Sequence, residues 1–205
     1  MCVLLAIDPG SSASGWVVYN SSWGVVLSAG IDKNEVLLER LRSEQDADQL
    51  VVEMIASYGM PVGREVFETC VWIGRFKEAY DGPSEWVYRR EVKLALCDSP
   101  RAKDANVRQA LIDMFGPGKG AAIGTKKVPG PLYGFKADMW AALGVAVAWV
   151  QKGGFDGAEG ESSKAAGNRH AGVVRPTKAA GLEGPPEHDA GSVGRKDGVG
   201  QGSRW

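Results

Sequence analysis

The chain has 205 residues, and 24 Lys and Arg against 25 Asp and Glu give a formal net charge of −1. This length suits one domain of ordinary size with some excess. The near-neutral charge excludes binding of nucleic acid through overall basicity, so such a partner would have to meet local patches. The three cysteines lack the spacing of a zinc site and indicate reduced thiols in the cytoplasm. No basic region followed by a cleavable apolar segment opens the chain, so we expect no secretory signal.

The N-terminal stretch predicts two strands separated by a loop of small residues. Residues 3–7 form an unbroken apolar run, and residues 16–19 are rich in β-branched and aromatic side chains. Asp8 follows the first run and opens a loop whose glycines and serines let another molecule approach the backbone. Asp8 therefore either starts an ordinary turn or points a carboxylate into a crevice that can take a phosphate.

The next segments predict a three-strand meander, a helix and a fourth strand. Residues 16–19 and 25–31 flank a short turn-rich connection, which favours an antiparallel hairpin. Asn34 is the expected N-cap of a helix over 35–41, where the leucines have helical spacing. Residues 50–53 end in a carboxylate and predict a strand parallel to the first, because a helix intervenes.

Residues 64–80 predict a helix that packs on the sheet. Trp72 and Phe76 lie beside the expected core-facing stripe and would leave apolar surface for a partner chain. The stripe itself consists of Val66, Phe67, Cys70, Ile73, Gly74 and Lys77.

The rest of the ordered part predicts a fifth strand and three helices. The strand is expected over 85–89 and a short helix over 91–97. An amphipathic helix over 104–115 turns Val107, Leu111, Met114 and Phe115 inward. Residues 116–136 predict a basic, glycine-rich loop. Residues 139–150 are apolar throughout but fall short of the roughly 20 needed to cross a bilayer, so they predict a buried helix and no membrane segment.

From Lys152 onward the chain changes character. This stretch holds nearly half of the 28 glycines and has almost no periodic apolar pattern. Such a composition predicts a disordered tail. We therefore expect a folded domain over 1–151 and a Gly-rich tail over 152–205.

Three acids share one kind of position, at the mouth of a buried element. Asp8 and Glu53 end apolar runs, and Asp138 opens the apolar segment 139–150. Carboxylates from separate elements suit Mg²⁺, with Mn²⁺ as a substitute, whereas clusters of His and Cys suit zinc. Two such cations can activate water and stabilise the charge that develops in phosphodiester hydrolysis. Asp138 is equally well placed as a helix N-cap, and the two roles can coexist.

The order of elements and several local motifs resemble one family. The motifs are residues 5–16 (LAIDPGSSASGW), 51–53 (VVE), 91–93 with 102–111 (EVK and AKDANVRQAL) and 136–148 (KADMWAALGVAVA). Over about residues 1–150 they resemble RuvC-like Holliday junction resolvases of the ribonuclease H-like superfamily. Including Gly-Thr-Lys-Lys at 124–127, the chain looks most similar to those of bacteriophages.

The resemblance implies an α/β ribonuclease H-like fold with a central mixed five-stranded sheet flanked by helices. It implies a Mg²⁺-dependent endonuclease that resolves Holliday junctions or related branched DNA in recombination and repair, within the cytoplasm of a host bacterium. Asp8, Glu53 and Asp138 would be catalytic and would bind the metal. Two strands of like polarity must be cut, so we expect a homodimer.

The sequence departs from the family at two points. The family commonly has an acid or a histidine three residues before the last Asp, and this chain has Phe135 there. Substrate phosphate, water, Glu65 or Glu68 could supply the missing ligand. The family's aromatic residue near the second acid has no match at Ala56, and Tyr58 is the nearest replacement for DNA contact.

Basic residues are expected around the acids, because uncompensated carboxylates repel phosphate. Each could also be a solvated surface charge, but as a cluster they favour nucleic acid. The predicted DNA-binding residues are Arg101, Lys103, Lys126, Lys127 and Lys136, with Lys119 in the same loop.

Other functions fit parts of the sequence. A DNA-architectural protein could retain the fold without catalysis, and Phe135 keeps this alternative open. An actin-like ATPase also opens with a strand, an Asp and a phosphate loop, but it needs a second lobe that the chain lacks room for. The resolvase-like family that processes ribosomal RNA precursors shares the fold but is usually shorter and has no such tail.

Overall fold

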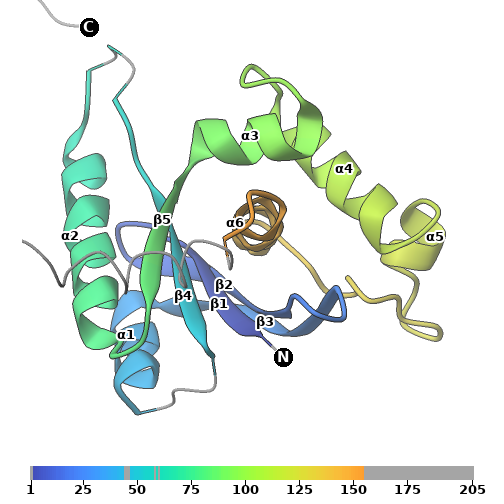
Figure 1. Ribbon diagram of the computed structural model, residues 1–205, viewed down its shortest axis with the longest axis horizontal. Coiled ribbons are helices and arrows are strands. Elements are labelled where there is room, and N and C mark those ends of the chain that lie inside the picture. Colours follow the sequence, from blue (N-terminus) through green and yellow to red (C-terminus); the bar gives the residue numbers. More distant parts are fainter. Residues whose placement is uncertain (1, 44–46, 58, 60, 155–205) are drawn as a thin grey trace, which may run out of the picture. The chain divides into compact units, whose positions relative to one another are not determined.

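The computed structural model describes residues 2–43, 47–57, 59 and 61–154. A five-stranded sheet in the order β3-β2-β1-β4-β5 forms its centre (Figure 1). Strands β1 (Val3–Asp8), β2 (Ala13–Asn20) and β3 (Val25–Lys33) form an antiparallel meander. Strands β4 (Gln49–Met54) and β5 (Ser84–Tyr88) run parallel to β1. The predicted sheet is confirmed, and the predicted tail lies almost wholly outside the described residues.

Helices cover both faces of the sheet. Helices α1 (Asn34–Ser43) and α2 (Arg64–Ala79) lie on one face. Helices α3 (Arg89–Cys97), α4 (Asp104–Phe115) and α6 (Met139–Gln151) lie on the other, and the short α5 (Lys119–Ala122) follows α4 (Figure 1). The two cores arise because side chains alternate along each strand. In β1, Leu4 and Ala6 join the α6 core, whereas Leu5 and Ile7 join the core under α1 and α2.

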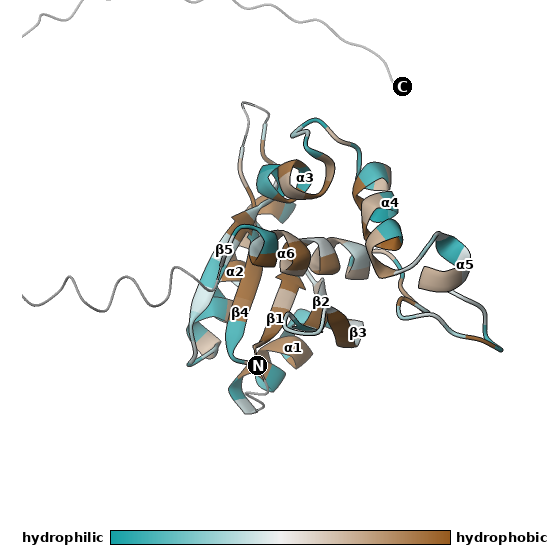
Figure 2. Ribbon diagram, turned by 45° about the vertical axis from the view of Figure 1, so that its right-hand side comes forward, coloured by the Kyte–Doolittle hydropathy of each residue, from teal (hydrophilic) through white to brown (hydrophobic). Residues whose placement is uncertain are grey.

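The core on the side of the sheet with α3, α4 and α6 packs around helix α6. Ten of its residues are buried, and Figure 2 shows β1 and α6 among the hydrophobic parts of the fold. The prediction of a buried helix is therefore confirmed. Within the described part of the chain, every helix is too short or too polar to span a bilayer.

The predicted face of α2 is wrong. Its buried residues are Thr69, Trp72, Ile73, Phe76 and Ala79, so only Ile73 is shared with the expected stripe. Phe67 and Val71 are each 61% exposed. The helix carries two apolar stripes at helical spacing, and the one with the larger aromatic area faces the sheet.

Three smaller expectations also need correction. Met114 on α4 is exposed rather than inward, while Phe115 packs against the core. Arg89 begins α3 instead of ending β5. The predicted loop 116–136 contains α5 and a bridge that pairs Gly124 with Pro129.

Candidate active site

The three predicted acids line one pocket of about 660 Å³. Asp8 ends β1 and Glu53 lies near the end of β4. These strands are parallel with Ile7 opposite Val52, so the residues that follow come side by side. Asp138 stands immediately before α6. The other lining residues are Arg89, Asp104, Ala105, Val107, Arg108, Ala137, Trp140 and Ala141.

A glycine on β2 lets the start of α6 approach the sheet. Gly15 pairs with Asp8 across the antiparallel ladder. A Cβ atom added at Gly15 would lie 2.5 Å from the backbone carbon and oxygen of Asp138. Real side chains do not tolerate such a distance, so only a residue without a side chain at position 15 leaves room for the backbone of Asp138.

We expect Gly15→Ala to lower the free energy of unfolding by ~1–3 kcal/mol, the usual cost of forcing an extra methyl group into a packed site. Gly74→Ala is the matched control, since no atom lies within 4 Å of its added Cβ. That control should be neutral or stabilising by up to about 1 kcal/mol, because Gly74 is inside a helix. Urea denaturation measures both, and equal stabilities would contradict the close approach of α6.

The loop after Asp8 is fixed by buried polar side chains. Ser14 Oγ donates to Asn34 Oδ1 at 2.6 Å, and Asn34 Nδ2 donates to the Gly10 carbonyl at 2.9 Å. Ser14 and Asn34 are both fully buried. Asn34, predicted as a helix N-cap, is the first residue of α1, and its side chain holds this loop.

The acids carry charge that the protein compensates only in part. Burial raises the pKa of the Asp8 carboxyl to about 8, the charge and hydrogen bond of Glu53 and the charge of Asp138 act in the same direction, and Arg89 opposes them. Burial likewise raises the pKa of Glu53, which is only 7% exposed, against the opposing charge of Arg89. It is therefore costly for both carboxyls to be charged together in this partly buried place without a cation beside them.

The structure adds a group of charged residues that sequence reasoning missed. Arg89 Nη1 lies 3.5 Å from Glu53 Oε2, and its Nη2 lies 2.8 Å from Asp104 Oδ1. Lys93 Nζ lies 3.4 Å from the same Asp104 oxygen. The sequence places Arg89 at the end of the predicted fifth strand, and only the observed strand order shows that this strand lies next to β4.

The residues fit a divalent cation by their donor chemistry. Asp8, Glu53 and Asp138 offer only oxygen atoms, the ligands that Mg²⁺ and Mn²⁺ prefer. No three His, Cys, Asp or Glu side chains of the described residues are already arranged around one metal position. The acids thus form a pocket of suitable ligands in which Arg89 neutralises part of the charge.

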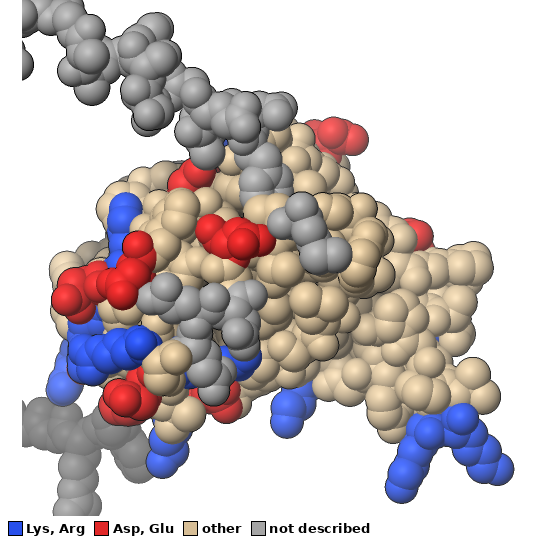
Figure 3. Space-filling model, turned by 60° about the horizontal axis from the view of Figure 1, so that its bottom comes forward, with Lys and Arg blue, Asp and Glu red and all other residues tan. Residues whose placement is uncertain are grey.

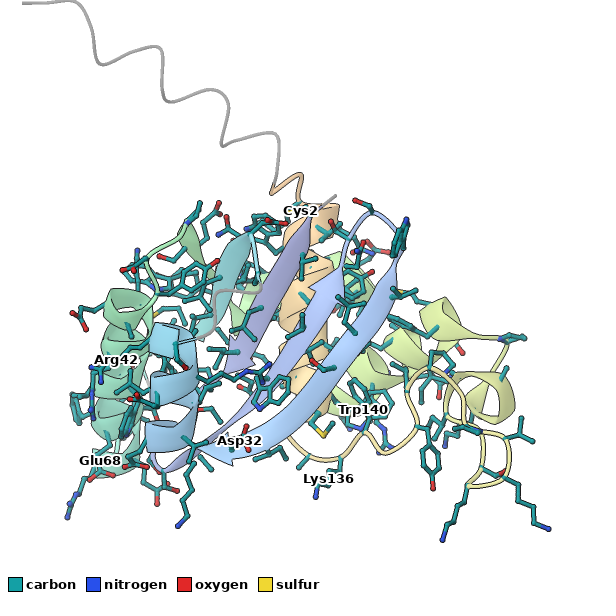
Figure 4. The ribbon with its side chains drawn as sticks, turned by 90° about the horizontal axis from the view of Figure 1, so that it is seen from below. Cys2, Asp32, Arg42, Glu68, Lys136 and Trp140 are labelled. Carbon is teal, nitrogen blue, oxygen red and sulfur yellow. The ribbon has the colours of Figure 1, made fainter. Side chains whose placement is uncertain are left out.

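The residues considered as a further metal ligand, and Phe135 in the position of the missing one, make contacts of another kind. Phe135 packs its ring 5.3 Å from that of Trp140. Glu68 pairs with Arg64 at 2.6 Å and lies on α2, well apart from Trp140 in Figure 4. Neither Glu65 nor Glu68 lines the acidic pocket, whereas Asp104 does.

One predicted DNA-binding residue lies beside the site. Arg101 shares a neighbouring pocket of about 460 Å³ with Arg89, Arg90, Lys93 and Pro100. On the face seen in Figure 3, acidic and basic side chains are interspersed on one side and most of the remaining surface is uncharged. Four other predicted DNA-binding residues are exposed and line neither pocket: Lys103, Lys126, Lys127 and Lys136. Tyr58 lies outside the described residues.

Comparisons with known proteins bear on the fold. No family model and no curated protein sequence matches the chain. The structure of Thermus thermophilus RuvC matches with a TM-score of 0.55 at 17% identity, covering 75% of this chain and 96% of that one. The same protein in complex with a Holliday junction substrate matches with a TM-score of 0.51 at 17% identity, covering 76% and 96%. The fowlpox virus Holliday junction resolvase matches with a TM-score of 0.43 at 11% identity, covering 73% and 99%. The chain has the ribonuclease H-like fold of RuvC, as its sequence motifs predict.

Proposed function

We propose that this protein is a metal-dependent, structure-selective endonuclease that hydrolyses phosphodiester bonds in branched DNA, including Holliday junctions. The observation that carries the proposal is that Asp8, Glu53 and Asp138 line one pocket on a RuvC fold. The RuvC structure with a Holliday junction substrate supports branched DNA as the class of substrate. We place the activity in residues 1–151 and in a reducing cytoplasm.

Each side chain of the site has a role in this proposal. Asp8, Glu53 and Asp138 would hold Mg²⁺, or Mn²⁺ in its place. A bound divalent cation supplies a Lewis acid for a phosphoryl oxygen and lowers the pKa of attached water. Only the charged form of Asp8 is a metal ligand, so a bound cation would offset the effects that raise the pKa of this carboxyl. The buried floor of the site, between β1, β4 and α6, keeps these groups at fixed positions.

Binding of DNA needs positive charge beside the acids, and the second pocket supplies it. Arg89, Arg90, Lys93 and Arg101 line that pocket, and Arg89 and Glu53 bring it next to the acidic one. Phosphates of a DNA arm are the ligands that such a group attracts. The exposed lysines at 126, 127 and 136 would contact the arms further from the cut.

Selective binding tests the choice of substrate without requiring catalysis. In a gel shift with chelator, the full chain should bind a labelled four-way junction. An excess of unlabelled duplex of the same sequence should not displace the junction. Affinity should fall as salt rises, because each phosphate contact releases counterions. Equal competition by duplex and junction would contradict structure selectivity.

We also propose a homodimer, because paired cuts in a symmetric junction need two equivalent sites. The expected contact through Trp72 and Phe76 is wrong, since both are buried in the core of their own chain. The exposed stripe of α2 offers Phe67 and Val71 instead. This stripe is apolar surface that a second copy could cover.

We therefore expect Val71→Glu to sediment as a monomer, while Val128→Glu keeps the mass of the wild type. Val128 is the matched control because it is 74% exposed and lies outside α2. A buried charge without a partner strongly opposes association, so the shift to monomer should be nearly complete. A Val71→Glu dimer would place the contact elsewhere. A wild type that stays monomeric with and without junction DNA would contradict paired cutting.

A further inference from the structure

Arg89 connects a buried acid of the site to an exposed acid outside the sheet. Its contact with Glu53 is 3.5 Å and its contact with Asp104 is 2.8 Å. The Arg89 side chain is 30% exposed, that of Glu53 only 10% and that of Asp104 71%. The guanidinium therefore bridges a carboxylate that water hardly reaches and one that water largely surrounds.

This bridge conflicts with a cation on Glu53. The guanidinium and a divalent cation would approach the same carboxylate, and charges of one sign repel strongly where water does not screen them. Burial of Glu53 makes some counter-charge necessary at all times, because an unpaired buried carboxylate is costly. A bound cation and the Arg89 guanidinium would therefore compete for Glu53.

Asp104 is placed to become the sole ion-pair partner of Arg89 at the site. Its contact with the guanidinium is the shorter of the two. The hydrogen bond from Arg89 is the main cause of the lowered pKa of Asp104, so this carboxylate is charged at neutral pH. The Asp104 side chain is largely exposed, so it can shift toward the guanidinium without disturbing the core. Lys93 on α3 contacts the same Asp104 oxygen.

Resting on the proposed function, we propose that Arg89 is a positioning residue that exchanges partners. In the metal-free protein it is the counter-charge of Glu53, and when a divalent cation binds Glu53 the guanidinium passes wholly to Asp104. The affinity of the site for metal is then set by the Arg89–Asp104 pair. Removing the charge of Arg89 should raise the affinity for metal, whereas removing the charge of Asp104 should lower it.

Mn²⁺ binding to the full chain without DNA tests this exchange, measured by calorimetry and by the electron paramagnetic resonance of free Mn²⁺. Arg89→Gln should bind Mn²⁺ roughly tenfold more tightly than the wild type, as expected when one charge leaves a poorly screened site. Arg89→Lys keeps the charge and should stay near the wild type. Arg64→Gln is the matched control, since Arg64 also pairs with a glutamate, Glu68, but lines neither pocket.

Asp104→Asn should bind Mn²⁺ more weakly, because the guanidinium loses its alternative partner. Asp113→Asn, on the same helix and also exposed, controls for the loss of one negative charge. In a double-mutant cycle, Asp104→Asn should have little further effect once Arg89 is Gln, because Asp104 acts through Arg89. Circular dichroism checks that each variant is folded. Asp104 lines the acidic pocket and Asp113 does not, so the cycle is what separates the exchange from a direct loss of charge. Arg89→Met, neutral and of similar length, replaces Arg89→Gln in the cycle if the latter does not fold.

The outcomes separate this inference from the function on which it rests. If the wild type binds Mn²⁺ but Arg89→Gln binds it no more tightly, the exchange is wrong and the metal centre stands. An Asp104→Asn effect that is the same in both backgrounds, or no larger than that of Asp113→Asn, also overturns it. If the wild type binds no Mn²⁺ at all, both the exchange and the metal centre fall.

Discussion

Asp8→Asn, Glu53→Gln and Asp138→Asn are each expected to lower the rate of junction cleavage about a thousandfold or more, which is about 4 kcal/mol of transition-state stabilisation. Each replaces a charged oxygen ligand by a neutral amide of nearly the same volume, so the pocket keeps its shape. Junction binding in chelator should be retained or slightly tighter, because one negative charge facing phosphate is lost. Single-turnover cleavage of a labelled four-way junction measures the effect.

Stability distinguishes a lost ligand from a damaged fold in these variants. The Asp8 carboxyl is partly buried beside two other acids, and its pKa of about 8 means that its charged form is disfavoured there. Asp8→Asn should therefore melt at or above the temperature of the wild type. Asp113→Asn, an exposed acid outside the pocket, should leave cleavage unchanged. Full cleavage by any of the three pocket variants would remove that residue from the site.

The largest expected effect on stability is that of Phe76→Ala. Phe76 is fully buried under the sheet, with its ring 5.8 Å from that of Trp72. Removing a buried phenyl group leaves a cavity and should lower the free energy of unfolding by ~3–5 kcal/mol. Urea denaturation of the full chain measures the change.

Phe67→Ala makes the same chemical change on the exposed stripe of the same helix. In the isolated chain it should cost no more than about 0.5 kcal/mol, because few contacts are lost. A loss that is larger for Phe67 than for Phe76 would mean that α2 packs through its other face, as the sequence alone suggested.

The placement of Asp8 and Glu53 could be predicted because it depends on local patterns. Each acid ends an apolar run, and the helix between the runs makes their strands parallel, so the two side chains meet at one edge of the sheet. Asp138 could be added because it precedes an apolar segment too short for a membrane. These inferences need only periodicity and chain connectivity.

The packed face of α2 could not be predicted with the same means. Its two stripes have the same spacing, and the choice between them depends on which side chains fill the space beneath α1 and β4. Trp72 and Phe76 fill that space, so Phe67 and Val71 are left outside. Local spacing does not carry this information.

The contact of Arg89 with Glu53 and Asp104 depends on three elements together. The register of β4 with β5 places Glu53 opposite Val87, close to the start of α3. The connection from α3 to α4 then brings Asp104 to the same guanidinium. Since neither the register nor the helix angle follows from composition, no local motif marks Arg89 as part of the site.

The central claim is metal-dependent cleavage of branched DNA, and one assay tests it most directly. The full wild-type chain is incubated with a labelled four-way junction, with duplex of the same sequence and with single strand, each with Mg²⁺, with Mn²⁺ and with chelator. We predict cuts in the junction with either metal, much slower or no cutting of duplex and single strand, and none in chelator. Equal cutting of all three substrates, cutting that persists in chelator, or an uncut junction in both metals would contradict the claim.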